Sequence, residues 1–164
     1  MIKASAATTL CLLGVVLSAC THIATPLTPA VTEATPDSAP PNYATALLDR
    51  STPEATAYSL MIAMYRGDTA MADAVFAPDG ELNRLSASGE IRRGARQGWQ
   101  DWVGTLEVGQ AREDLFDIKV EQFGRLATVW APFTISIDGE LRGCGVNSFT
   151  MVDMGEDDAP EWRI

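Results

Sequence analysis

The chain has 164 residues, an apolar content of 46% and a formal net charge of −10. This length suggests one folded domain with additional segments, and the acidity argues against binding nucleic acid or docking on anionic lipid by charge alone. The only histidine is His22, beside the proposed anchor described below. A histidine triad, a Cys–His pair and a His-rich metal site are therefore excluded from the folded part, and we expect no metal and no other cofactor.

Residues 1–19 have the three parts of a secretory signal peptide. Lys3 supplies a positive start, residues 10–17 form a short apolar run, and the small residues Ser18 and Ala19 follow. The apolar run is too short to span a bilayer comfortably. We therefore predict that residues 1–19 are a signal peptide that is removed from the mature protein.

The end of this leader, Leu17-Ser18-Ala19-Cys20, resembles a bacterial lipobox. The resemblance implies that Cys20 receives diacylglycerol on its sulfur, that cleavage occurs before Cys20, and that the new amine is acylated, for example with palmitate. Two or more acyl chains give stable membrane anchoring where one does not. Thr21 after the cysteine, rather than Asp, favours the outer membrane of the cell envelope, facing the periplasm. The alternative is an ordinary secreted protein with a cysteine near its cleavage site.

Residues 20–50 are predicted to be the lipidated cysteine followed by a tether. Residues 21–42 are rich in Thr, Ala and Pro and have almost no large apolar side chains, so they cannot bury enough surface to fold. The folded domain begins near Tyr43 or Ser51, and we assign it to residues 51–164.

The first half of the domain has helical patterns. Ser51 and Glu54 fit a capping box at the start of a first helix. Gly67 can end this helix and Asp68 can cap a second one. A third helix is predicted over residues 95–106, weakened by internal glycines.

The second half of the domain is predicted to be antiparallel sheet. After a short hairpin within residues 81–93, alternating apolar residues predict a strand over Asp114–Phe123, with Phe116 on its apolar face. A long strand ends at the turn Asp138-Gly139, its partner follows, and a short strand closes the chain. The predicted helices come first in the chain and a meander of antiparallel strands comes last. This order indicates an α+β fold, with helices packed on one face of a curved antiparallel sheet.

This order of elements resembles the NTF2-like superfamily, in its SnoaL-like and lumazine-binding-like branches. Local resemblances lie in the loop Phe76–Gly80, the long strand Gly143–Val152 and the closing segment Glu161–Ile164. The resemblance covers about residues 51–164. It implies a cone, in which a bent sheet wraps a long helix and leaves a pocket at its open end. Family members include isomerases, dehydratases, epoxide hydrolases and binding modules, so the fold alone does not determine the function.

Five side chains are candidates for lining such a pocket: Tyr58, Tyr65, Trp99, Trp102 and Cys144. Aromatic side chains bury a large area and offer a polar tip, but the same residues could simply pack in the core. Cys144 has no nearby histidine to activate it, so we expect a small side chain where the sheet bends rather than a nucleophile.

The resemblance also implies that an enzyme of this family would use an acid–base group inside the cone, often Asp, His or Tyr. The candidates considered are Asp73, Asp101 and Asp117, and each is expected to be a solvated charge. We therefore predict no catalytic residue and no metal-binding residue.

Two surface features remain open. Arg92, Arg93 and Arg96 could hold an anionic ligand or could form a solvated surface of an acidic protein. Trp130 lies on a more polar strand face and could be exposed at a homodimer interface through the sheet. The leading hypothesis is an envelope lipoprotein whose domain binds a small apolar ligand or a protein partner without catalysis. The alternative is an isomerase-type or dehydratase-type enzyme acting on a small hydrophobic substrate in the cone.

Overall fold

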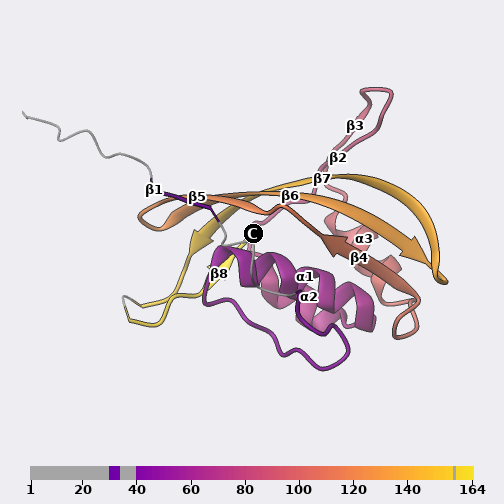
Figure 1. Cartoon of the computed structure of the whole chain (residues 1–164), viewed down its shortest axis with the longest axis horizontal. Helices are drawn as coiled ribbons and strands as arrows, with labels where there is room; N and C mark the ends of the chain where they lie inside the picture. The colour runs from indigo at the N-terminus through magenta and orange to yellow at the C-terminus, as the bar shows by residue number, and fades with distance from the viewer. Residues whose placement is uncertain (1–29, 34–39, 157) are drawn as a thin grey trace, which may run out of the picture.

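The computed structural model describes residues 30–33, 40–156 and 158–164 (Figure 1). The predicted signal peptide, Cys20, and residues 21–29 and 34–39 of the predicted tether lie outside the described residues. Within those ranges, no helix has the length and apolar character needed to cross a membrane. The segment before Ser51 already packs on the domain, because Tyr43 is buried and its hydroxyl donates to the backbone carbonyl of Glu113 at 2.9 Å.

The helices of the described part are α1 (Pro53–Arg66), α2 (Thr69–Val75) and α3 (Arg96–Val103). The Thr52 hydroxyl accepts the Ala55 N–H at the start of α1, so the capping box predicted for Ser51 and Glu54 is wrong by one residue. Gly67 ends α1 in the left-handed conformation and the Asp68 side chain caps α2, as predicted.

The strands form one large curved sheet and one small hairpin. The hairpin pairs β2 (Arg84–Leu85) with β3 (Ile91–Arg92). The large antiparallel sheet has the order β1-β5-β6-β7-β8, with β4 also paired to β6. Its strands are β1 (Ala30–Glu33), β4 (Ala111–Leu115), β5 (Lys119–Phe123), β6 (Leu126–Ile137), β7 (Glu140–Asp153) and β8 (Trp162–Arg163).

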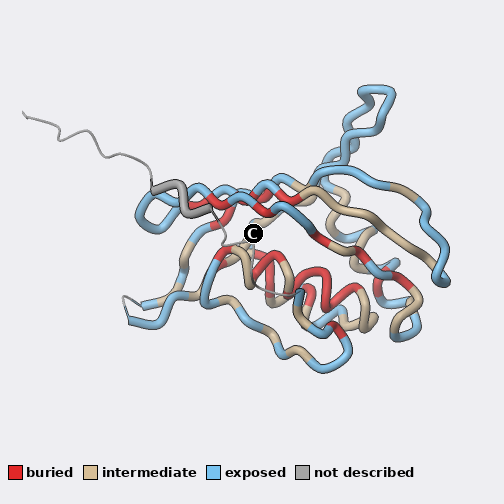
Figure 2. Tube along the Cα trace, viewed as in Figure 1, coloured by how far each residue is buried: buried red, intermediate tan, exposed pale blue. Residues whose placement is uncertain are grey.

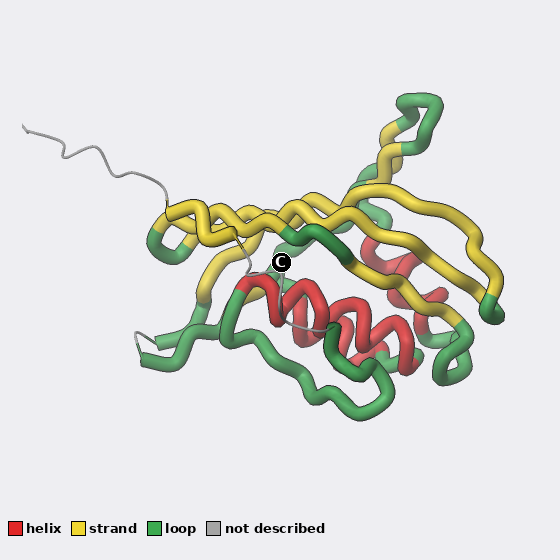
Figure 3. Tube along the Cα trace, in the orientation of Figure 1, coloured by secondary structure: helices red, strands yellow, loops and turns green. Residues whose placement is uncertain are grey.

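The helices gather on one side of the large sheet, while the β2–β3 hairpin projects away from the body (Figures 1 and 3). Such an arrangement lets the apolar face of each helix cover the concave face of the sheet. The predicted fold class, an α+β cone with three helices packed on a curved antiparallel sheet, is confirmed.

The strand predicted over Asp114–Phe123 is wrong, because the structure has two strands there. β4 ends at Leu115 and β5 begins at Lys119, although both pair with β6. Asp117 adopts a positive φ of 48° between them. The break lies opposite Pro132, which has no N–H to donate to a neighbouring strand. As a result, the residues that face inward change phase at this point.

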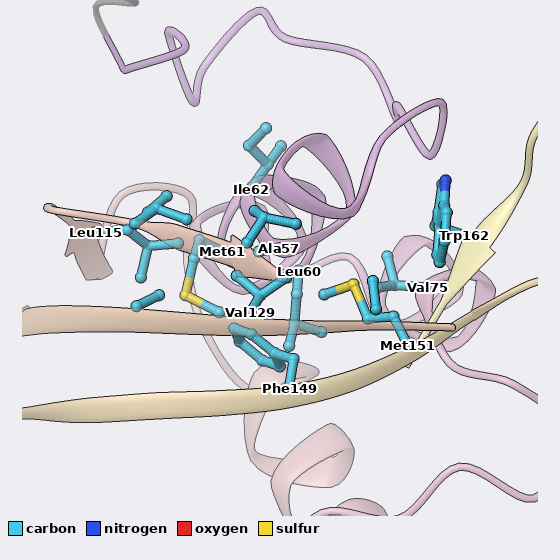
Figure 4. Close-up of a cluster of buried hydrophobic side chains, with 14 of the residues drawn as sticks. Ala57, Leu60, Met61, Ile62, Val75, Leu115, Val129, Phe149, Met151 and Trp162 are labelled. Carbon is cyan, nitrogen blue, oxygen red and sulfur yellow. The ribbon is translucent and has the colours of Figure 1, made fainter. Parts of the chain in front are cut away.

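The core lies between α1 and the concave face of the sheet. Figure 4 shows Leu60 and Met61 of α1 meeting Val129, Phe149 and Met151 of the sheet, and all five are buried. Figure 2 shows the same concentration of buried residues along α1 and the middle of the sheet. Burying each such side chain contributes about 1.5–3 kcal/mol, so this layer fixes the position of α1 against the sheet.

The outer face of the sheet is open in this single chain. Trp130 lies on it with 52% of its surface exposed. The homodimer through the sheet face stays a prediction.

Candidate functional site

A pocket of about 330 Å³ lies between α1, the β2 region and the concave ends of β4, β6 and β7. Its apolar wall includes Met61 and Met64 from α1, Trp99 from α3, and Phe133 and Ile135 from β6. This is the open end of the cone. A pocket with an apolar wall and few polar groups is the usual setting for binding a small molecule.

Four polar side chains line the same pocket: Asn83, Arg84, Glu113 and Asn147. Glu113 is the buried one, with 8% of its surface exposed. It points inward because β4 alternates, placing Ala111, Glu113 and Leu115 on its buried face.

Asn147 of β7 holds the Glu113 carboxyl group in position. Its Nδ2 donates to Oε1 of Glu113 at 2.6 Å. Among the described residues, this is the only hydrogen-bond partner of the carboxyl group. The second carboxyl oxygen is therefore free to bond a molecule in the pocket.

Burial raises the pKa of Glu113 to about 7, although the Asn147 hydrogen bond and the positive charge of Arg84 both act to lower it. Desolvation disfavours the charged form of a carboxyl group, and here this effect exceeds the two opposing ones. Both protonation states are therefore populated near neutral pH. A group with this property can accept a proton and return it.

The predicted pocket residues separate in the structure. Trp99 lines the cone pocket, and Cys144 borders it. Cys144 is exposed, and its cross-strand partner is Thr134, so its side chain shares the outer face of the sheet. Tyr58 instead lines a second, open hollow of about 540 Å³ between α1 and the segment around Leu47.

The other two predicted residues line neither of these cavities. Tyr65 packs edge-on against Tyr43, with ring centroids 5.9 Å apart. Trp102 has 36% of its surface exposed.

The three acids weighed from the sequence lie outside the pocket. Asp73 is exposed and accepts a hydrogen bond from Arg96 at 2.6 Å, Asp101 is exposed on α3, and Asp117 is exposed at the strand break. Glu113 was not among the predicted residues, because the strand predicted from the sequence began at Asp114. The signal that could have found it is the alternation Ala111, Glu113, Leu115.

The three arginines of the predicted basic cluster do not lie together in the structure. Arg96 packs into the body, where it bonds Asp73 and the backbone carbonyls of Ala77 and Gly80. Arg92 and Arg93 remain exposed at the β2–β3 hairpin. Arg84, which was not part of the predicted cluster, lies on β2 opposite Arg92 and lines the pocket.

The comparisons with known proteins bear on the fold of the chain. No model of a known protein family matches the sequence, and no curated protein matches it. The structure is similar to that of a protein of unknown function from Mycobacterium tuberculosis, at 18% identity over 68% of each chain, with a TM-score of 0.51.

Two further solved structures are similar at a lower level. One is a provisionally assigned dehydratase of the NTF2-like family from Streptomyces avermitilis, at 17% identity over 65% of this chain and 85% of that one, with a TM-score of 0.49. The other is an NTF2-like protein of unknown function from Shewanella baltica, at 11% identity over 66% of this chain and 81% of that one, with a TM-score of 0.48. Similarity at such low identity concerns the fold, the curved sheet and helices described above, and not the activity.

Proposed function

We propose that the domain takes up a small, mostly apolar molecule in the cone pocket and that Glu113 transfers a proton to or from it. The observation that supports this proposal is a carboxyl group buried in the pocket, bonded at one oxygen by Asn147, with a pKa of about 7. A general acid–base works best when its pKa lies near the working pH.

An isomerase-type or dehydratase-type reaction suits this arrangement. The Glu113 carboxylate removes a proton from a carbon next to an electron-withdrawing group, and the apolar wall holds the substrate. In an isomerisation, the Glu113 carboxyl group returns the proton to another carbon. In a dehydration, it gives the proton to the departing hydroxyl group, which leaves as water. Asn147 keeps the carboxyl group oriented throughout.

The second candidate function is binding without catalysis. It is favoured by one observation: Glu113 is the only acidic residue among the described residues that line the pocket, and no histidine lines it. A single acidic group without a partner acid or base can orient a bound ligand without changing it.

Hydrogen exchange at carbon separates the two candidates. We would incubate the full-length protein with apolar ketones, such as β-tetralone, in D₂O and follow deuterium incorporation by mass spectrometry. Proton transfer through Glu113 predicts faster exchange than in buffer, with a rate that rises with pH and levels off above about pH 7. Glu113→Gln should reduce the enhancement by about 10²-fold or more.

Glu121→Gln is the matched control, because Glu121 is an exposed carboxylate on β5 outside the pocket. It should leave the exchange rate unchanged. Ketones that bind in the pocket without any exchange would leave binding as the function. Equal exchange rates for the wild type and Glu113→Gln would refute the role of Glu113.

We also propose that the protein is a lipoprotein of the bacterial cell envelope, anchored through Cys20. The support is the leader and the sequence Leu17-Ser18-Ala19-Cys20. In that setting the domain would act on a molecule that is present at the membrane or in the periplasm.

A further inference from the structure

Three arginines stand out because they lack partners. Arg84, Arg92 and Arg93 make no ion pair or side-chain hydrogen bond with any residue that the structure describes. Every other arginine of the chain does have such a partner. All three unpaired side chains belong to the β2–β3 hairpin and the residue after it.

The hairpin places two of these charges side by side. Arg84 of β2 is directly opposite Arg92 of β3, so their side chains share one face. Like charges at this position destabilise a hairpin unless an anion lies between them. Glu90 lines the same shallow surface hollow as Arg84 and Arg92 but forms no ion pair with either.

Arg84 connects this positive charge to the cone. It lines the pocket together with Leu85, and its charge acts on the Glu113 carboxyl group. In a protein with a net charge of −10, the unpaired Arg84, with Arg92 opposite it, places positive charge at the side of the pocket formed by β2. Such a region attracts small anions and orients them on entry.

We propose that the molecule taken up by the cone pocket is an amphipathic carboxylic acid, whose carboxylate Arg84 binds at the entrance with Arg92 beside it. The planar guanidinium group matches a carboxylate through two parallel hydrogen bonds. The apolar body of the acid lies against Met61, Met64 and Trp99. This inference rests on the proposed small-molecule site and names its substrate class.

Matched acid and amide pairs test the role of the charge. We would measure binding of hydrocinnamate, indole acetate and decanoate to the full-length protein by calorimetry, each beside its neutral amide. The acids should bind about tenfold more tightly than the amides, because a charged hydrogen bond is stronger but Arg84 is exposed to solvent. Arg84→Gln should remove this preference, because it should weaken binding of the acids more than binding of the amides.

Arg93→Gln is the matched control, because it removes the same charge from a residue that does not line the pocket. It should keep the preference for acids. Amides that bind as tightly as acids would overturn the inference and leave the proposed pocket intact. An equal loss of the preference in both variants would show general attraction by charge and overturn the role of Arg84. Failure of every acid and amide to bind would count against both the inference and the pocket.

Discussion

At the scale of single residues, Glu113 makes the folded state sensitive to pH. Its pKa is about 7 in the folded protein against an ordinary value of 4.5, because burial disfavours the charged form. The folded state therefore holds a proton that the unfolded chain releases between these two values. The free energy of unfolding must then fall as pH rises through this window, by on the order of 3 kcal/mol if the whole shift is realised.

Glu113→Gln should remove this dependence. Glutamine stays neutral at every pH, and its carbonyl oxygen can still accept the hydrogen bond from Asn147. Denaturant titrations at about pH 5 and about pH 8 should show a wild type that loses stability on the alkaline side and a variant that does not. Glu121→Gln should follow the wild type. A variant that keeps the full pH dependence would show that Glu113 ionises normally.

The sequence predicts some residues of the pocket but not its central group. Trp99 and Trp102 are both candidates from the apolar pattern of α3, but Trp99 lines the pocket whereas Trp102 is 36% exposed, so the pattern alone does not separate them. An acidic residue in a strand is ordinarily solvated, so composition gives no reason to place Glu113 inside. Its burial depends on the phase of β4, which the alternation of Ala111, Glu113 and Leu115 indicates only when the strand is started at Ala111 rather than at Asp114.

At the scale of elements, the ends of the helices are determined by neighbouring residues in the chain. Which residues of a strand face inward also depends on the strands that pair with it. Gly67 and Asp68 mark the α1–α2 junction because a cap needs only its own neighbours. The change of phase between β4 and β5 instead coincides with Pro132 on another strand. The apolar alternation of Phe116, Ile118 and Val120 therefore matches the buried face only from Ile118 onward: Ile118 and Val120 are buried, whereas Phe116 is 44% exposed.

Two glycines give opposite predictions for the same substitution. Gly67 has a φ of 65°, and a Cβ there would meet the backbone carbonyl of Leu106. Gly67→Ala should therefore cost about 2–4 kcal/mol, from the left-handed conformation and the overlap together. Gly98 lies within α3, and a Cβ there would have open space around it, so Gly98→Ala should stabilise by about 0.5–1 kcal/mol.

Denaturant titrations of the two variants against the wild type measure both effects. Each is the same glycine-to-alanine change, so the sign of the difference reports the local backbone. A Gly67→Ala protein as stable as the wild type would mean that the junction between α1 and α2 relaxes, and α1 would then be a poor support for the pocket.

At the scale of the whole molecule, the charge is divided unevenly. The net charge is −10, yet the unpaired arginines of the described part gather on the β2–β3 hairpin. Cations near an anionic bilayer contribute about 1 kcal/mol each, so Arg84, Arg92 and Arg93 together supply roughly 3 kcal/mol before repulsion from the acidic remainder is subtracted. Acyl chains contribute about 0.8 kcal/mol per buried CH₂ group, and two or more of them exceed this amount several-fold. The proposed membrane attachment therefore depends on the proposed lipidation of Cys20 and not on the hairpin arginines.

Cys20→Ser tests this attachment directly. After expression of the full chain in a bacterium that processes lipoproteins, extraction into a detergent that separates into phases on warming should place the wild type in the detergent phase. The Cys20→Ser protein should move to the aqueous phase, because its hairpin arginines cannot replace the acyl chains. Cys11→Ser is the matched control, since Cys11 lies in the leader that cleavage would remove, and it should behave as the wild type does. A wild-type protein found in the aqueous phase, with an unmodified N-terminal peptide by mass spectrometry, would contradict the proposed anchor. The domain would then bind the proposed carboxylic acid as a freely diffusing protein.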